Sequence, residues 1–291
     1  MINFQVNAAS RRCALLLSVT MLMAGCAQPA AERRSGIQRM YVFDCGEIHV
    51  ADISRWSPGV NVGQPADFSD NCYLIKHTKG LMLWDSGLAD SIADQPDGVT
   101  AAGGTLTMHK SKTLAAQLAE IGVAPSQVTH LAFSHTHSDH VGNANLFTAA
   151  TLYIQQSEYD AAFGPEAAKF NFVPANYEKL RANPMVKLNG DYDIFGDGSV
   201  LILATPGHTP GHQSLLVRLP KRGAVVLSGD AAHFQDNWVN RRVPGFNFDK
   251  EQSRQSMDKI AAILTVERAQ LWINHDKAQS SAIPHGPQFV E

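Results

Sequence analysis

The feature that most constrains this chain is a dense run of metal-binding residue types, His135-Thr136-His137-Ser138-Asp139-His140. An apolar run at 128–133 precedes it and is typical of a buried strand. Side chains two positions apart in an extended segment point the same way, so His135 and His137 can bind one cation together. Asp139 and His140 follow as the chain turns towards a helix, where they can bind a second cation. A polar loop that caps the helix is the alternative interpretation.

Three later apolar runs each end in another side chain that can bind a metal: His208 after 200–204, Asp230 after 224–227 and His275 after 271–273. Small residues beside His208 and Asp230 permit a tight turn and a close approach to a site. Buried charged groups are costly unless they are paired or coordinated, and metal ions would offset that cost. The sequence therefore predicts a metal centre at which several strand ends meet.

Short apolar runs recur along the body of the chain and predict strands at 40–45, 72–76, 81–84, 128–133, 151–154, 200–204, 214–217, 224–227 and 271–273. Apolar residues at helical spacing predict helices at 111–121 and 251–264, and 157–182 reads as two short helices. No flexible or charged linker divides the body, so we expect a single domain. Strands mixed with helices, with polar motifs at the strand ends, predict an α/β sandwich.

Composition excludes several classes of protein. Of the 291 residues, 44% are hydrophobic and 18% are charged, which is ordinary for a globular chain and excludes a disordered, collagen-like or polytopic membrane protein. There are 24 Lys and Arg against 27 Asp and Glu, a net charge of −3. This balance provides no electrostatic attraction for nucleic acid, and we expect no such partner.

The N-terminal segment predicts export. Two basic residues, Arg11 and Arg12, precede an apolar run at 13–23 and then Ala24-Gly25-Cys26, the pattern of a signal peptide at 1–25. The sequence Met-Ala-Gly-Cys at 23–26 resembles a bacterial lipobox, which implies a lipid anchor on Cys26 and a periplasmic or outer-membrane lipoprotein. An ordinary cleaved signal peptide is the alternative. We expect a flexible tether at 26–38 and the folded domain at 39–291.

Two cysteines remain in the body, Cys45 and Cys72. Neither belongs to a Cys-x-x-Cys pair, so the sequence disfavours a thiolate metal site or a redox motif. Each lies in a strand-like run, and we expect two buried free thiols. A disulfide between them is the alternative in an oxidising compartment.

The metal-binding pattern resembles the metallo-β-lactamase superfamily over about residues 39–285. The resemblance implies an α/β fold of the αββα sandwich type and two zinc ions, although other divalent metals remain open. It assigns the first zinc to His135, His137 and His208, the second to Asp139, His140 and His275, and the bridge to Asp230. Such a set leaves open positions, as a catalytic zinc site requires.

Further segments resemble the N-acyl homoserine lactonases of this superfamily, namely 71–74 (NCYL), 85–87 (DSG), 206–214 (PGHTPGHQS) and 245–249 (GFNFD). This resemblance implies a hydrolase that opens the lactone ring of bacterial quorum-sensing signals by attack of a hydroxide held between the metals. Asp139 would then deliver a proton to the leaving alkoxide. Many members have Tyr where this chain has His233, which is a candidate donor to the developing oxyanion or else a packing residue.

Other residues have less specific interpretations. His212 is expected to support the site or the fold, and Asp85 either contacts a metal-binding histidine or shapes a turn. Six apolar residues are candidates to line an acyl-chain pocket, with the core as the alternative for each: Met108, Phe163, Phe170, Phe172, Trp238 and Phe246.

Competing functions remain within the same fold. A phosphotriesterase or an aryl-ester hydrolase is the main alternative, and a β-lactam hydrolase is disfavoured because such enzymes generally lack a bridging carboxylate like Asp230. A non-enzymatic binding module would lack metal ligands, and none is missing from the pattern. Partners beyond a small lactone and the lipid anchor are not indicated, and a homodimer stays open.

Overall fold

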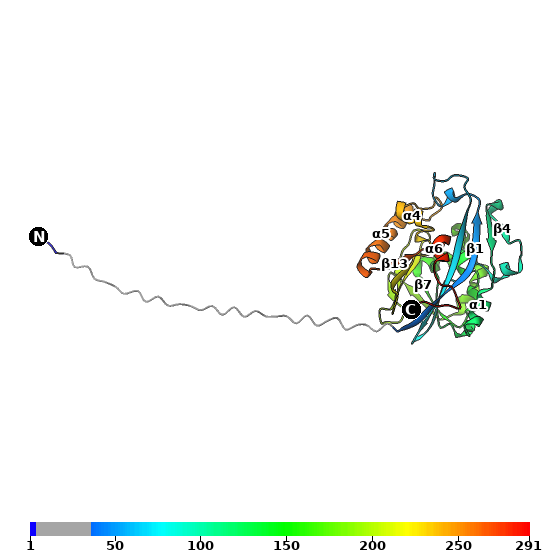
Figure 1. The fold of residues 1–291 in the computed structure, drawn as a ribbon, viewed down its shortest axis with the longest axis horizontal. Helices are drawn as coiled ribbons and strands as arrows, with labels where there is room; N and C mark the ends of the chain where they lie inside the picture. Colours follow the sequence, from blue (N-terminus) through cyan, green and yellow to red (C-terminus); the bar gives the residue numbers. More distant parts are fainter. Residues whose placement is uncertain (4–35) are drawn as a thin grey trace. The chain divides into compact units, whose positions relative to one another are not determined.

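A computed structural model describes residues 1–3 and 36–291 (Figure 1). Nearly all of the predicted signal peptide and most of the predicted tether lie outside these residues. The first strand, β1 (Ile37–Val50), begins inside the segment 26–38 that we expected to be a tether. Ile37 is buried and pairs with His77 of the next strand, so the folded part begins two residues before the predicted boundary.

Two β-sheets form the centre of the described part of the chain. The first has eight strands in the order β4-β5-β1-β2-β3-β6-β7-β8, and the second has five in the order β13-β12-β11-β10-β9. Besides β1, the first sheet contains β2 (Ala66–His77), β3 (Gly80–Trp84), β4 (Val99–Ala101), β5 (Leu106–His109), β6 (His130–Ala132), β7 (Thr151–Gln155) and β8 (Met185–Leu188). The second contains β9 (Tyr192–Asp193), β10 (Val200–Ala204), β11 (Gln213–Leu219), β12 (Gly223–Leu227) and β13 (Gln270–Trp272).

The two sheets pack face to face, because alternate residues of their strands place apolar side chains on the face that meets the other sheet. Met82 and Trp84 of β3 belong to the buried cluster between the sheets, together with Val217 of β11 and Leu227 of β12. The intervening Leu83 points to the opposite face and packs in a second cluster. Each such fully buried apolar side chain contributes about 1.5–3 kcal/mol relative to its exposed state.

Helices cover the outer faces of both sheets and complete an αββα sandwich (Figure 1). Helix α1 (Leu114–Glu120) packs through Leu114 and Leu118 on the first sheet. Helix α5 (Lys250–Glu267) packs through Ile260 on Leu216 and Val226 of the second sheet. The remaining helices are α2 (Ser138–Val141), α3 (Gln156–Phe163), α4 (Gln235–Asn240) and α6 (Lys277–Ser281). The predicted fold class is therefore confirmed.

All nine predicted strands are present, and the two longer predicted helices correspond to α1 and α5. The segment 157–182 differs from the prediction, since only α3 is an α-helix and three short 3-10 turns follow it. Gly164 and Pro165 end α3, and Pro174 begins the second of these turns. Four strands were not predicted, β4, β5, β8 and β9, because they are only two to four residues long and mostly half-buried.

The expectation that Cys45 and Cys72 are free thiols is wrong, because the structure joins them in a disulfide. Cys72 of β2 pairs with Phe43 of β1, and a register shift follows between Asp44 and Gly46. This irregularity brings the Cα atoms of the two cysteines to 5.8 Å, within the range that a disulfide requires. Register between strands cannot be read from the spacing of cysteines, which explains the error.

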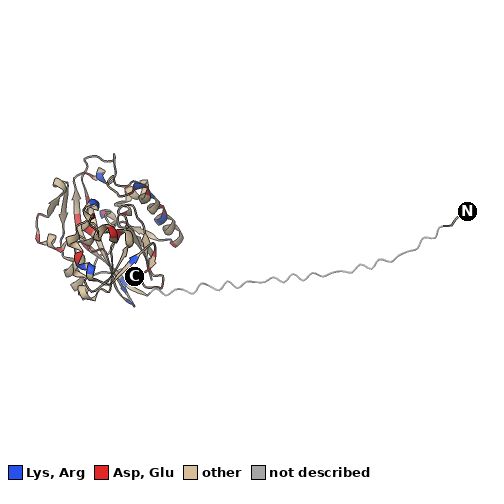
Figure 2. Cartoon of the chain, turned by 180° about the vertical axis from the view of Figure 1, so that it is seen from behind, with Lys and Arg blue, Asp and Glu red and all other residues tan. Residues whose placement is uncertain are grey.

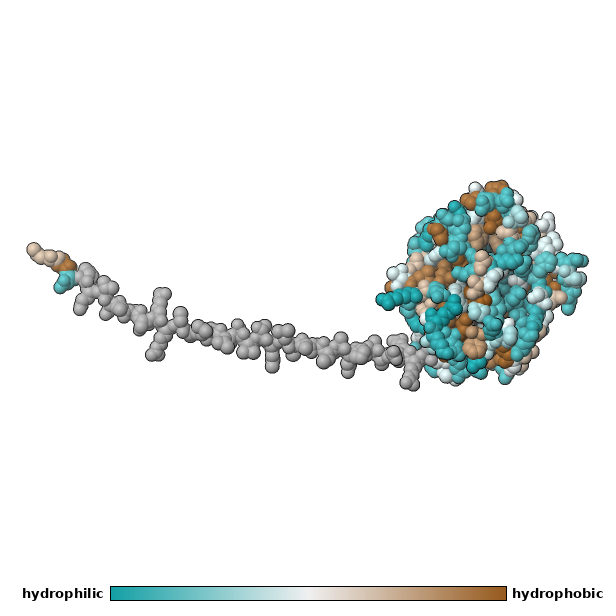
Figure 3. Space-filling view, viewed as in Figure 1, coloured by the Kyte–Doolittle hydropathy of each residue, from teal (hydrophilic) through white to brown (hydrophobic). Residues whose placement is uncertain are grey.

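Charged residues of both signs are mixed along the chain, since Figure 2 shows Lys and Arg interspersed with Asp and Glu. The face seen in Figure 3 has small apolar patches separated by hydrophilic side chains. Among residues 1–3 and 36–291, no helix is both long enough and apolar enough to cross a bilayer.

Candidate metal centre

All seven predicted metal ligands come together at the ends of the strands that precede them in the sequence. His135 and His137 follow β6, Asp139 and His140 lie in α2, and the other three follow β10, β12 and β13. They form two groups whose ligand atoms lie within 4.8 Å of one another: His135, His137, His208 and Asp230 in the first, and Asp139, His140 and His275 in the second. The resemblance to the metallo-β-lactamase superfamily had implied the same grouping of the histidines.

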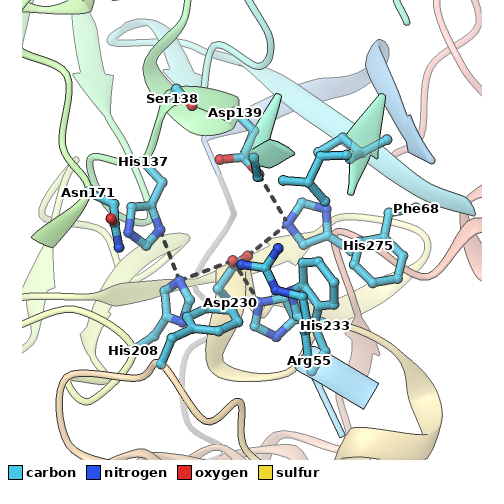
Figure 4. A pocket seen from close by; sticks show the side chains of 15 residues that line it. Arg55, Phe68, His137, Ser138, Asp139, Asn171, His208, Asp230, His233 and His275 are labelled. Carbon is cyan, nitrogen blue, oxygen red and sulfur yellow. Dashed lines mark hydrogen bonds and ion pairs between the residues drawn. The ribbon is translucent and has the colours of Figure 1, made fainter. Parts of the chain in front are cut away.

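Asp230 lies between the two groups (Figure 4). Its Oδ2 is 3.3 Å from Nε2 of His208 and 3.8 Å from Nε2 of His135. Its Oδ1 is 3.3 Å from Nε2 of His140 and 3.1 Å from Nε2 of His275. One carboxylate oxygen therefore faces each group, which is the arrangement required of a ligand shared by two cations.

The donor atoms fit divalent cations. His137 Nδ1 is 2.8 Å from His135 Nε2 and 3.1 Å from His208 Nε2, so three imidazole nitrogens converge on one point. Within the described residues, Nε2 of His140 and Oδ1 of Asp230 are buried without a hydrogen-bond partner. Buried polar atoms without a partner are costly, and a cation would satisfy both. Imidazole and carboxylate donors are those that Zn²⁺ prefers in catalytic sites.

The second ring nitrogen of each histidine in the two groups also has a hydrogen-bond partner. The partners are Ser134 Oγ for His135 (3.1 Å), Phe170 O for His137 (3.0 Å), Asp85 Oδ2 for His140 (3.1 Å), Asn247 Oδ1 for His208 (3.0 Å) and Ser69 O for His275 (2.8 Å). Such contacts fix which ring nitrogen is available to a metal and how the ring is turned. The sequence had left Asp85 open between this role and a turn, and the structure shows both, since its φ of 56° lies in the left-handed region.

His212 supports the bridging carboxylate rather than joining the ligands. It is buried, its Nδ1 lies 2.9 Å from Thr205 O, and its Nε2 accepts a hydrogen bond of 2.9 Å from the backbone N–H of Asp230. Sequence reasoning missed Asn247, although it lies in the lactonase-like segment 245–249. The only signal for it was that resemblance, because an asparagine in a loop has no pattern of its own.

Burial and charge shift the pKa values of these groups in different directions. Burial lowers the pKa of His135 and His208 well below the usual value, so their neutral rings offer lone pairs. Burial also lowers the pKa of His275, but the Asp230 carboxylate outweighs this effect and raises it to about 9. A cation held by His275 would have to displace this proton, so its binding would weaken as the pH falls.

A cavity of about 320 Å³ opens over the two groups. His137, Asp139, His208, Asp230 and His275 form part of its lining, and the predicted catalytic residue His233 lies beside them (Figure 4). Six of its other lining residues are apolar, namely Ile48, Trp56, Phe68, Ala102, Leu106 and Phe246. The remaining three are Arg55, Ser138 and Asn171. The site thus combines a polar floor with an apolar wall.

Of the six apolar residues proposed from the sequence, Phe246 alone lines this cavity among the described residues. Phe163 and Phe172 belong to the core beside α3, where Phe170 packs against them. Met108 packs behind the cavity wall, and Trp238 packs near α5. The rest of the wall comes from strands β1, β2 and β5 and from the connections that hold Trp56 and Ala102, and their meeting at one place depends on tertiary structure rather than on local pattern.

Comparison with known proteins supports this geometry. Residues 66–265 match the profile of the Metallo-beta-lactamase superfamily. The chain is 34% identical to an N-acyl homoserine lactonase, AttM, of Azorhizobium caulinodans, over 87% of this chain and 98% of the relative. It is 30% identical to the N-acyl homoserine lactonase of Bacillus cereus, over 87% and 99% of the two chains.

Solved structures agree. An N-acyl homoserine lactone hydrolase with the product N-hexanoyl-L-homoserine bound at its catalytic metal centre has a TM-score of 0.76 and 25% identity, covering 87% of this chain and 99% of that chain. AidC, a dizinc quorum-quenching lactonase, has a TM-score of 0.61 at 18% identity, covering 88% and 96% of the two chains, and shows that the fold is shared.

The shared position of Asp230 generates a test. We expect the purified protein to contain about two divalent ions per chain, and Asp230→Ala to lose much of the second equivalent, because the variant lacks the ligand common to both groups. Metal content measured by inductively coupled plasma mass spectrometry checks this. Asp160→Ala, which removes an exposed carboxylate on α3, is the control. A single tightly bound ion in active wild-type protein would contradict the two-cation interpretation.

Proposed function

Because the chain belongs to the N-acyl homoserine lactonase family of the metallo-β-lactamase superfamily, we propose that it opens the lactone ring of N-acyl homoserine lactones by hydrolysis. The observation that carries the proposal is the position of Asp230, whose two oxygens face both histidine groups on the floor of a cavity with an apolar wall. The lactone ring would react on the floor, beside Asp230, and the acyl chain would lie against the apolar wall.

We propose that the cofactor is two Zn²⁺ ions, held by the seven ligands, although the same donors accept other divalent metals. Bound there, the ions would supply a nucleophilic hydroxide near neutral pH and polarise the ester carbonyl. Asp139 is suited to proton transfer because it lines the cavity and its side chain keeps 23% exposure. Its Oδ2 lies 3.8 Å from His275 Nε2, so it faces the reacting centre. We assign to it the transfer of a proton, which it would take from the oxygen that attacked the carbonyl and deliver to the leaving alkoxide.

His233 is placed to act on the bridging carboxylate. Its Nε2 lies 3.0 Å from Asp230 Oδ2, and its ring stacks on that of His275 with 5.6 Å between centroids. Burial lowers the pKa of His233, so the ring is neutral and carries a single N–H. That N–H is donated to Asp230. We therefore propose that His233 first orients Asp230, and that donation to a developing oxyanion would require this contact to break.

The apolar wall is suited to an acyl chain. Trp56 packs edge-on against Phe68 and Phe246, with centroids 4.9 and 5.9 Å away, which gives a rigid aromatic surface. Arg55 lies at the mouth, where it donates a hydrogen bond of 3.0 Å to Thr105 Oγ1. A substrate with a polar head and an apolar tail matches this division of the cavity.

The test is a hydrolysis panel of acyl homoserine lactones, simple lactones, a paraoxon-like phosphotriester, aryl esters and a β-lactam. We expect the highest kcat/KM for an acyl homoserine lactone, because that substrate uses both the polar floor and the apolar wall. Asp230→Ala, assayed in parallel, identifies any contaminating activity. If kcat/KM for the triester or the β-lactam exceeds that for every lactone tried, the proposed substrate is wrong.

The role of His233 predicts a graded response. His233→Phe should lower kcat about 10–100-fold, the usual effect of losing a residue that supports a metal ligand. His233→Tyr should retain much of the activity, because a phenol O–H can donate to Asp230. The matched control is His130→Phe, since His130 begins β6 at the end of that strand away from His135 and does not line the cavity. Kinetics in which His233→Phe equals the wild type would return this residue to a packing role.

We also propose that the protein is an exported lipoprotein anchored through Cys26, a residue outside those that the structure describes. The support is the sequence pattern at 11–26. A single acyl chain anchors a protein only weakly, so stable anchoring needs more than one chain. Cells labelled with a radioactive fatty acid should yield labelled wild-type protein in the membrane fraction and unlabelled Cys26→Ser protein. Unlabelled, freely soluble wild-type protein would show that the lipobox interpretation is wrong.

A further inference from the structure

Glu158 of α3 is not a metal ligand and does not line the cavity, yet it contacts both loops that carry the first histidine group. We infer that Glu158 is a positioning residue, whose carboxylate holds these two loops at the separation that one cation requires. The inference rests on the metal-binding part of the proposed function and is independent of the substrate.

The carboxylate of Glu158 accepts four hydrogen bonds. Its Oε1 accepts from the backbone N–H of Thr136 at 2.9 Å and from the hydroxyl of the same residue at 2.8 Å. Its Oε2 accepts from the hydroxyl of Thr209 at 2.8 Å and from the backbone N–H of Gly211 at 2.9 Å. One oxygen thus binds each loop, and each loop supplies one side-chain and one backbone donor.

Three of the four donor groups belong to residues next to a predicted metal ligand in the sequence, and the fourth, the N–H of Gly211, lies three residues after His208. Thr136 stands between His135 and His137, and Thr209 follows His208 directly. Across these loops, His208 Nε2 is only 3.1 Å from His137 Nδ1. A carboxylate that binds both loops therefore acts on the distance between ligands that come from different sheets.

Close packing shows that the loop at 209–211 sits directly on the start of α3. A Cβ atom at Gly211 would lie 2.3 Å from the backbone N of Glu158. Only glycine, which has no Cβ atom, fits there without a clash. Ser157 Oγ also donates a hydrogen bond of 3.0 Å to Pro210 O. The first turn of α3 is therefore fixed against this loop, and Glu158 has little freedom to turn away.

The burial of Glu158 argues against a role in packing alone. Only 2% of the residue is exposed, and an ionised carboxylate is costly in such surroundings. Burial raises the pKa of Glu158, whereas the hydroxyl and N–H donors from Thr209, Thr136 and Gly211 lower it. An apolar residue of similar size would fill the space without that cost, but it would leave the donors of both loops without an acceptor.

The effect should be confined to one metal group. The second group is oriented by other contacts, from Asp85 to His140 and from Ser69 to His275. No hydrogen bond in the described structure joins Glu158 to Asp139, His140 or His275. Loss of the Glu158 carboxylate should therefore weaken one of the two binding steps and leave the other near its wild-type value.

The experiment compares Glu158→Gln, Glu158→Ala and the control Glu166→Gln, which removes an exposed carboxylate paired with Lys169. Metal-free proteins are titrated with Zn²⁺ in competition with a chromophoric chelator, which resolves two dissociation constants. The same proteins loaded with Co²⁺ report ligand geometry through their visible absorption. Circular dichroism and the Tm without metal establish that each variant is folded.

We expect Glu158→Gln to weaken one binding step about 10–100-fold and to change the Co²⁺ spectrum, because its amide N–H₂ opposes a donor of the loop. Glu166→Gln should match the wild type. Folded Glu158 variants with two wild-type constants would overturn the inference, as would equal weakening of both steps in proportion to a lower Tm. If Glu158→Ala fails to fold, Glu158→Gln and Thr209→Val decide the question. Wild-type protein that binds no cation would overturn the proposed function as well.

Discussion

A buried carboxylate, Asp230, is the group on which the rest of the site depends. Burial alone would raise its pKa, but His275, His233, His140 and His135 surround it and lower the pKa well below the usual value. One oxygen of this carboxylate faces each histidine group, so a cation held by either group would lie beside it. The short turn after β12 and the contact with His212 position this carboxylate.

Much of this arrangement could be predicted from the sequence, for a physical reason. Strands are short, apolar and bounded by polar residues, so ligands that follow them are expected at one edge of a sheet. His135 and His137 show the two-residue spacing that places side chains on one side of an extended chain. The αββα arrangement and the pairing of ligands into two groups came from resemblance, since neither sheet order nor distance is encoded in local pattern.

What could not be predicted depends on register and on loops. The bond between Cys45 and Cys72 follows from an irregularity in the pairing of β1 with β2. The cavity wall includes Trp56, which lies in the long connection between β1 and β2, and Phe68 of β2. Other aromatic residues, such as Phe163, pack in the core instead, and residue type alone does not separate the two groups. The acceptors behind the histidines include backbone carbonyls of Phe170 and Ser69, which carry no sequence signal.

The origin of the ligands links metal binding to the stability of the sandwich. Each group combines residues that follow β6 in the first sheet with a histidine that follows a strand of the second, His208 after β10 or His275 after β13. A cation in either group therefore joins the two sheets at the edge where their apolar cluster ends. Because the unfolded chain cannot present such a set, binding favours the folded state, by about 2.7 kcal/mol at a free concentration 100 times the Kd. The contacts that orient the ligands, including those of Glu158, add to this stabilisation when they raise the affinity for a cation.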